Sequence, residues 1–174
     1  NETSKIYDPF TSVNDLPIPI KNAPTIEFVK NKLSAANSDQ VGFFVIVRNP
    51  YERIVSDLFF LHKINVNATK NETFNIIKEY LKSDNLDNHN IPQYMFVTNN
   101  NKELVPNIHI LHTNTLTSDM INLGYEDFNI HKYANKLKPE EYYNYLNDDS
   151  IKLINDFYDY DFTLFNYDKI QTFD

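Results

Sequence analysis

The sequence predicts an α/β fold in which a parallel sheet lies between layers of helices. A continuous apolar run, VGFFVIV at 41–47, is typical of a strand that is buried on both faces. A second strand is predicted at 107–113, where NIHILHT alternates apolar and polar residues. Amphipathic segments precede and follow these runs. Strands that alternate with helices indicate a three-layer arrangement with a parallel sheet.

Each expected helix has apolar residues that share one helical face. Pro50 suits the first turn of the helix that follows the first strand, and Gly124 suits the end of a later one. The predicted helices cover 24–36, a segment from Pro50 onward, 71–83, a capped segment that closes at Gly124, 139–147 and 149–158. Residues 1–23 are rich in turn formers and predict an irregular lead-in. Residues 84–103 are loop-like, with a short apolar piece at 94–97.

Composition narrows the class of protein. The chain has 174 residues without a compositional break, which predicts a single domain over 1–174. A net charge of −8 argues against nucleic acid or an anionic membrane surface as a partner. The absence of cysteine excludes disulfides and Cys-based zinc sites. No apolar run approaches the ~18 residues that span a bilayer, so no membrane segment is expected.

The only two arginines, Arg48 and Arg53, directly follow the first predicted strand. Ligands of open α/β sheets bind beyond the carboxyl ends of the strands, where a helix N-terminus also favours anions. Arg48 could donate two hydrogen bonds to a phosphate there, and the Ser56 hydroxyl could donate to the same oxyanion. In the alternative, Arg48 pairs with a carboxylate and Ser56 is a small helix residue. The spacing alone leaves both open.

The segment VIVRNPYERIVSDLFF resembles the 3′-phosphate-binding segment of sulfotransferases that use 3′-phosphoadenosine 5′-phosphosulfate (PAPS), closest to the carbohydrate (Golgi-type) enzymes. That pattern is a hydrophobic strand followed by Arg-[Asp/Asn]-Pro-x-x-Arg-[aliphatic]-x-Ser, and every fixed position is present. The resemblance implies a P-loop-NTPase-like sulfotransferase fold. It also implies that Arg48 and Ser56 bind the 3′-phosphate of the co-substrate, and that Arg53 is structural.

Three later segments are similar to the same family and extend the resemblance over roughly residues 24–168. HNIPQY at 89–94 resembles a His-x-x-Pro-Gln element. NIHILHTNTLTSDM is similar to a later strand and helix. The family ending, Tyr-x-x-Asp-Phe-x-x-Phe-x-Tyr, is matched at 158–167.

One family element is not found in residues 1–42: a Lys-containing strand–turn–helix that binds the 5′-phosphosulfate. We expect this loop to lie before Asn1, so that the fold formed by residues 1–174 is incomplete at its N-terminus. The alternative is a protein that binds without catalysing.

The sequence also offers a candidate for the catalytic base and one for a further contact with the cofactor or acceptor. Sulfuryl transfer to a hydroxyl needs a proton acceptor, and His89 is the best candidate. The alternative is a loop histidine that shapes the site or contacts the acceptor. Lys132, in the basic patch HKYANKLK at 131–138, corresponds to a loop that touches the cofactor or acceptor in the family, or lies in a solvated basic loop. No metal site is predicted, since His109 and His112 should point to opposite faces of their strand.

The sequence therefore predicts a PAPS-dependent sulfotransferase that moves a sulfuryl group to a hydroxyl, with a carbohydrate as acceptor and PAP (3′-phosphoadenosine 5′-phosphate) as the released nucleotide. Two alternatives stay open. The first is a non-catalytic PAP-, nucleotide- or glycan-binding module derived from this fold. The second is another α/β phosphotransfer or interaction domain in which Arg48 and Ser56 do not converge. Two settings are also open, the Golgi lumen or the cytoplasm in a microbial or viral source.

Overall fold

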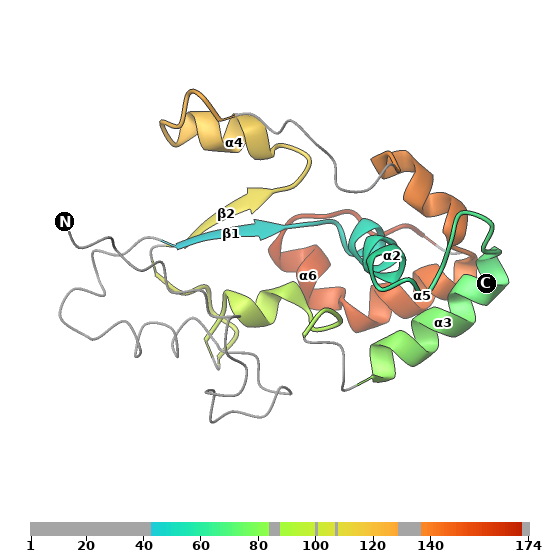
Figure 1. The fold of residues 1–174 in the computed structure, drawn as a ribbon. Coiled ribbons are helices and arrows are strands. Elements are labelled where there is room, and N and C mark those ends of the chain that lie inside the picture. Colours follow the sequence, from blue (N-terminus) through green and yellow to red (C-terminus); the bar gives the residue numbers. More distant parts are fainter. Residues whose placement is uncertain (1–42, 84–87, 100, 107, 129–136, 172–174) are drawn as a thin grey trace, which may run out of the picture.

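A computed structural model describes residues 43–83, 88–99, 101–106, 108–128 and 137–171 (Figure 1). Several predictions fall outside these residues. They are the lead-in at 1–23, the helix at 24–36, the first two residues of the strand at 41–47, and Lys132.

The described sheet consists of two parallel strands, β1 (Phe43–Val47) and β2 (Ile108–His112). In their register Phe43 lies opposite Ile108 and Val47 lies opposite His112. Both strands lie where the hydrophobic patterns predicted them, and their parallel pairing is confirmed. The described part of the chain is therefore mixed α/β, with a small parallel sheet and several helices.

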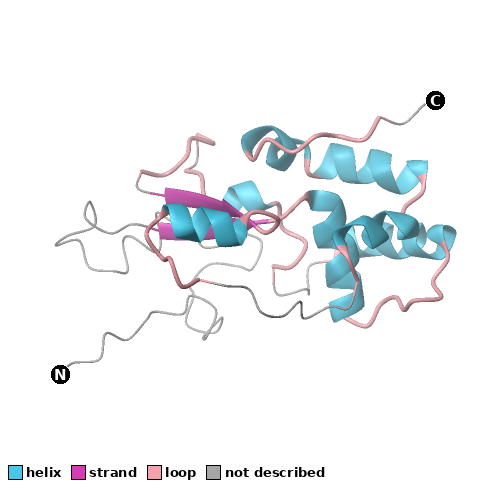
Figure 2. Ribbon diagram, turned by 90° about the horizontal axis from the view of Figure 1, so that it is seen from above, coloured by secondary structure: helices cyan, strands magenta, loops and turns pink. Residues whose placement is uncertain are grey.

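The helices follow the predicted order along the chain. Their bounds are α2 Pro50–Phe60, α3 Lys70–Lys82, η3 Gln93–Phe96, α4 Leu116–Asn122, η4 Pro139–Tyr145, α5 Asp148–Phe157 and α6 Asp159–Leu164, where η marks a 3₁₀ helix. Figure 1 shows β1 pointing toward the group formed by α2, α3, α5 and α6, with α4 beside the sheet. Figure 2 shows from above that most helices gather at this one end.

Sequence patterns predicted some of these elements with the wrong type or extent. The segment predicted as a helix at 139–147 is the 3₁₀ helix η4, in which residues three apart stack along one line. Tyr142 and Tyr145 are spaced in this way and both are buried, so the tighter helix places two large rings into the core together. The α6 helix and η3 were not predicted. A break at Tyr158 separates α6 from α5, and the buried Tyr158 ring lies at that break.

A single large core holds the helical end together. It is built mainly from buried side chains of α2, α3, η4, α5 and α6, and its largest fully buried members are Tyr51, Ile54, Leu58, Ile77, Tyr80, Tyr142, Leu146, Ile154 and Phe162. A second, smaller cluster of Val47, Val97 and Phe165 lies against the sheet. Aromatic rings supply much of this packing, which fits a sequence without tryptophan.

Helix α4 closes at Gly124, as the sequence predicted. Gly124 has a φ of 92°, a conformation that other residues adopt only with strain. Its N–H donates to the Ile121 carbonyl at 2.9 Å, and the Tyr125 N–H donates to the Met120 carbonyl at 3.1 Å. This pair of bonds is the Schellman arrangement, which satisfies the last carbonyls of a helix.

Among the residues that the structure describes, no helix combines the length and the apolar character needed to cross a bilayer.

The N-terminus of α3 gives a direct test of local stability. The Thr69 hydroxyl accepts the Glu72 N–H at 3.2 Å, and the Glu72 carboxylate accepts the Thr69 N–H at 2.8 Å. Thr69→Ala should lower the free energy of unfolding in urea by about 1 kcal/mol, because one orphan N–H loses its acceptor. Thr69→Ser is the matched control and should stay near wild type. Equal stability of the alanine and serine variants would contradict the cap.

Because the same cap includes the Glu72 carboxylate, the contribution of the cap to stability should depend on pH. Hydrogen bonds from the Thr69 N–H and hydroxyl lower the pKa of Glu72. A lowered pKa in the folded state means that the stabilisation is present at neutral pH and is lost as pH falls through that pKa. Glu72→Gln should therefore destabilise the protein at neutral pH and have little effect in acid, as measured by thermal unfolding at each pH.

Candidate functional site

The candidate site begins where β1 ends and α2 starts. Asn49 is the N-cap of α2, and its side-chain oxygen accepts the Tyr51 N–H at 3.0 Å. Pro50 occupies the first helical position, where its missing N–H has no consequence. The residue between strand and cap is Arg48, so its side chain leaves the backbone at the carboxyl end of β1.

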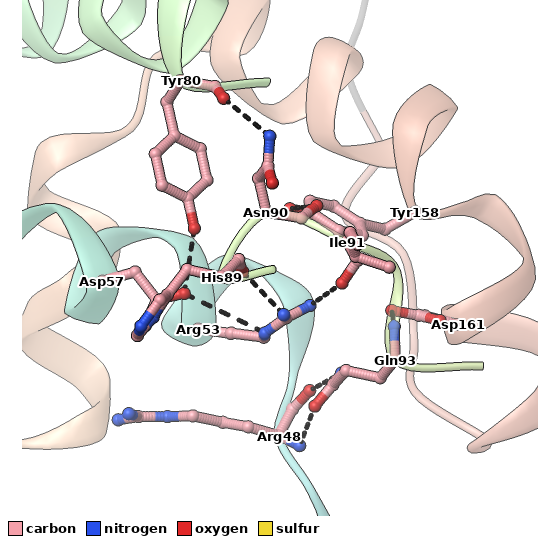
Figure 3. A network of polar contacts seen from close by, with 10 residues as sticks. All are labelled: Arg48, Arg53, Asp57, Tyr80, His89, Asn90, Ile91, Gln93, Tyr158 and Asp161. Atoms are coloured by element: carbon pink, nitrogen blue, oxygen red, sulfur yellow. Dashed lines mark hydrogen bonds and ion pairs between the residues drawn. The ribbon is translucent and has the colours of Figure 1, made fainter. Parts of the chain in front are cut away.

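A glutamine at the start of η3 fixes the backbone at this point (Figure 3). The Arg48 N–H donates to Gln93 Oε1 at 2.9 Å, and Gln93 Nε2 donates to the Arg48 carbonyl at 2.8 Å. The buried Asp161 carboxylate in turn accepts the N–H groups of Gln93 and Tyr94 at 2.8 and 2.7 Å. The end of β1, η3 and α6 are thereby joined through two side chains.

Arg53 has a structural position, as the resemblance implied. Its Nη1 donates to the Ile91 carbonyl at 2.8 Å and its Nη2 donates to the His89 carbonyl at 2.6 Å. Its Nε lies 4.0 Å from Asp57 Oδ2. The guanidinium therefore fastens the loop at 89–91 to α2.

The Arg48 side chain is held differently. Its Nε lies 3.5 Å from Glu52 Oε2, and its guanidinium carbon lies 4.9 Å from the centre of the Tyr142 ring. The Nε is buried without a hydrogen-bond partner among the described residues. The side chain as a whole is 27% exposed, and its terminal amino groups form no hydrogen bond with another described residue. The carboxylate pairing considered from the sequence is present, and it leaves donors of Arg48 available.

Ser56 is buried in α2, one helical turn after Glu52. Residues four apart lie on the same side of a helix, so Ser56 and the carboxylate that contacts Arg48 share one face. The role of Ser56 in binding a phosphate stays a prediction. The same holds for Lys132, which lies outside the described residues.

His89 also lies against α2. Its Nδ1 is 3.9 Å from Asp57 Oδ1, and its ring stacks on Phe60 with centroids 5.6 Å apart. The Nε2 forms no hydrogen bond with another described residue, and the side chain is 34% exposed. A general base needs an accessible nitrogen of this kind, but its catalytic role stays a prediction.

Burial controls the carboxyl groups of this region. It raises the pKa of Asp57, against the opposing effects of the Arg53 charge, the Tyr80 hydroxyl, and the His89 and Arg48 charges. The Arg48 charge is thus close enough to be felt at Asp57. Burial also raises the pKa of Asp161, although the N–H groups of Tyr94 and Gln93 favour its ionised form.

The two histidines of β2 point to opposite faces, as the strand period predicted. The His109 ring stacks on Phe44 with centroids 5.2 Å apart, and His112 Nε2 lies 3.1 Å from the Phe165 carbonyl oxygen. Within the described ranges, no group of three histidine or carboxylate side chains is placed to hold a metal ion.

Sequence reasoning gave no role to Gln93 or Asp161, although both lie in segments that carry the resemblance. Gln93 follows Pro92 in a segment that the sequence predicted as loop-like, where a buried amide side chain has no periodic signature, and the structure makes it the first residue of η3. Asp161 offers a weak signal, since an aspartate inside the aromatic run DYDFTLF must either face solvent or have buried donors. Its carboxylate is completely buried and has those donors.

Comparisons with protein-family models, with curated proteins and with solved structures give no match to this chain. The sulfotransferase resemblance therefore rests on the residues alone. The segments that carry it are far apart in sequence and close together in space. Residues 48–56 contact 89–93, Asp161 contacts Gln93, and the Tyr167 hydroxyl donates to the Val47 carbonyl at 3.3 Å.

The buried Asp161 is the sharpest test of this arrangement. Asp161→Asn should lower the free energy of unfolding by about 1–3 kcal/mol, because an amide can accept only one of the two N–H groups and its own NH₂ lacks a partner. Urea unfolding measures the loss. Asp168→Asn, at an exposed position, is the matched control and should stay near wild type. An Asp161→Asn variant as stable as wild type would mean that this carboxylate does not cap η3.

Proposed function

We propose that this chain is part of a PAPS-dependent sulfotransferase that moves a sulfuryl group to a hydroxyl of a carbohydrate. The convergence of the separate motif segments around the end of β1 is the observation that carries the proposal. A chance match of one motif would not place three other segments of the same pattern beside it. The proposal includes a P-loop-NTPase-like fold of three layers, in which a larger parallel sheet lies between layers of helices and β1 and β2 are two of its strands.

The residues at the end of β1 fit the 3′-phosphate of the co-substrate. Among the described residues, the buried Nε of Arg48 has no hydrogen-bond partner, and its terminal amino groups form no hydrogen bond. Unsatisfied buried donors are rare in proteins, and an anion that accepts from Arg48 would satisfy this one. The α2 N-terminus adds its positive dipole end. Ser56 would supply a hydroxyl from the same helix.

Glu52 opposes this binding and sets its strength. Its carboxylate lies 3.5 Å from Arg48 Nε, so a bound phosphate would share the guanidinium with a negative charge. The Glu52 side chain is largely buried and cannot be screened as well as a surface charge. The phosphate must therefore compete with Glu52 or displace it from Arg48.

The chain's own residues would divide the chemistry between nucleotide binding and proton transfer. Arg48 and Ser56 bind the 3′-phosphate and so orient the nucleotide. His89 accepts the proton of the acceptor hydroxyl. PAPS, when bound, supplies an activated sulfuryl group that passes directly to the acceptor oxygen. Gln93 and Arg53 keep the end of β1 and the loop of His89 in place relative to each other.

Calorimetry with PAP and with adenosine 5′-monophosphate tests the cofactor assignment. Arg48→Ala should weaken PAP binding by about 10- to 100-fold, the loss of a charge-assisted hydrogen bond. It should leave the weaker binding of the monophosphate unchanged, since that nucleotide has no 3′-phosphate. Lys63→Ala removes an equal charge at an exposed position and should bind PAP as wild type does. Absence of PAP binding by the wild type, or equal binding by Arg48→Ala, would refute the proposal.

Glu52→Gln gives the opposite expectation. Removal of a carboxylate beside Arg48 should tighten PAP binding by at least about 5-fold, the ratio for ~1 kcal/mol of removed repulsion. The same calorimetric titration measures it. Glu126→Gln, an exposed glutamate after α4, is the control for the change in net charge. Weaker PAP binding by Glu52→Gln would indicate that the ion pair with Arg48 is needed to position the guanidinium.

PAP binding without turnover of PAPS by the full-length natural protein would favour the non-catalytic binding module over the enzyme.

A further inference from the structure

Asp57 of α2 lies beside the candidate base and has no part in the phosphate contacts proposed above. Its Oδ2 accepts a hydrogen bond from the Tyr80 hydroxyl at 3.0 Å and lies 4.0 Å from Arg53 Nε. Its Oδ1 lies 3.9 Å from His89 Nδ1. The two oxygens thus have different neighbours. One is fixed to α3 and α2, and the other faces the imidazole (Figure 3).

His89 is held by α2 at two further points. Phe60, three residues after Asp57 and on the same side of the helix, stacks on the imidazole with an interplanar angle of 23°. Arg53 Nη2 donates to the His89 carbonyl at 2.6 Å, which fixes the backbone. Three side chains of α2 therefore position His89. Phe60 contacts the face of the ring, Asp57 lies near its Nδ1 edge, and Arg53 binds its carbonyl.

This arrangement favours one ring nitrogen as the acceptor, through an ion-pair contact of 3.9 Å between Asp57 Oδ1 and Nδ1 rather than a hydrogen bond. A neutral imidazole carries its proton on one nitrogen, and a neighbouring carboxylate favours that proton on the nitrogen that faces it. Asp57 therefore favours the proton on Nδ1 and the lone pair on Nε2. Phe60, whose ring stacks on the imidazole, is 63% exposed as a residue. The imidazole thus lies beside an accessible apolar ring, which suits the apolar face of a sugar.

We propose that Asp57 is a positioning residue that holds His89 as the proton acceptor of the transfer reaction; this inference rests on the proposed function. The acceptor oxygen forms a bond to sulfur while the bond between that sulfur and the 5′-phosphate oxygen breaks. The 5′-phosphate oxygen leaves with the electron pair, as part of PAP. The hydroxyl proton passes to His89 Nε2, and Asp57 stabilises the resulting imidazolium through its Nδ1–H.

Nitrogen NMR of the histidine rings tests the contact without any turnover. In the wild type at a pH where His89 is neutral, the proton should reside on Nδ1. In Asp57→Asn the population should shift toward the Nε2-protonated form, whereas Asp156→Asn, an exposed aspartate of α5, should match the wild type. A wild-type His89 protonated on Nε2 would overturn the inference. That spectrum needs no variant, so a poorly folded Asp57→Asn would not remove the test.

Turnover of PAPS by the full-length natural protein, followed as PAP release with a panel of saccharides, tests the catalytic role. His89→Gln should lower kcat/KM by roughly 10²- to 10⁴-fold, the usual contribution of a general base. Asp57→Asn should lower it by at least ~10-fold, because a base in the wrong tautomer loses activity. The double variant should equal His89→Gln alone, since Asp57 acts only through His89. Additive losses would show that Asp57 has a merely structural role and would overturn the inference.

The outcomes separate this inference from the proposed function. Neither Asp57 nor His89 is placed at the 3′-phosphate, so both variants should bind PAP as wild type does in calorimetry. Wild-type binding of PAP with full turnover by His89→Gln would overturn the base and leave the sulfotransferase proposal standing. Absence of PAP binding by the wild type would overturn the proposed function and the catalytic role of His89 with it. The NMR measurement would still decide whether Asp57 sets the tautomer.

Discussion

The buried Asp161 carboxylate is the constraint on which the arrangement around β1 depends. It accepts the N–H groups of Gln93 and Tyr94, and so it fixes the start of η3. With its backbone fixed, Gln93 can present both ends of its amide to the Arg48 peptide. A carboxylate buried to this degree is tolerated only when donors surround it. The fold thus relies on a buried acidic group to set where a partly exposed arginine emerges.

The two arginines of the chain have different roles, although both act through a guanidinium group. Arg53 uses the fork of its guanidinium inward, to bind two loop carbonyls that are two residues apart. A lysine could not satisfy both with fixed geometry. Arg48 keeps its donors toward a partly exposed surface and meets Glu52 and an aromatic ring. The guanidinium of Arg53 holds the backbone of the candidate site in place, and that of Arg48 lies partly exposed in the site.

The sequence predicted the local elements near the site well because their signals are local. An apolar run, an Asn-Pro pair and the spacing of Ile54, Val55 and Leu58 are enough to place β1 and α2. Long-range polar contacts have no such signal. Nothing in the spacing of Gln93 and Asp161 indicates that they meet, because their contact depends on how α6 turns after Tyr158. The 3₁₀ form of η4 was missed for a similar reason, since its type follows from two tyrosines that must enter one core.

The stacking of Arg48 on Tyr142 bears on the entropy of any binding event at this surface. A free arginine side chain samples many rotamers, and ordering it on a ligand opposes binding by up to about 2 kcal/mol. The ring centred 4.9 Å from the guanidinium carbon restricts those rotamers before a ligand arrives. Much of the ordering is therefore completed during folding, when the core around η4 closes. A residue with no direct contact to a ligand can in this way determine how tightly one is held.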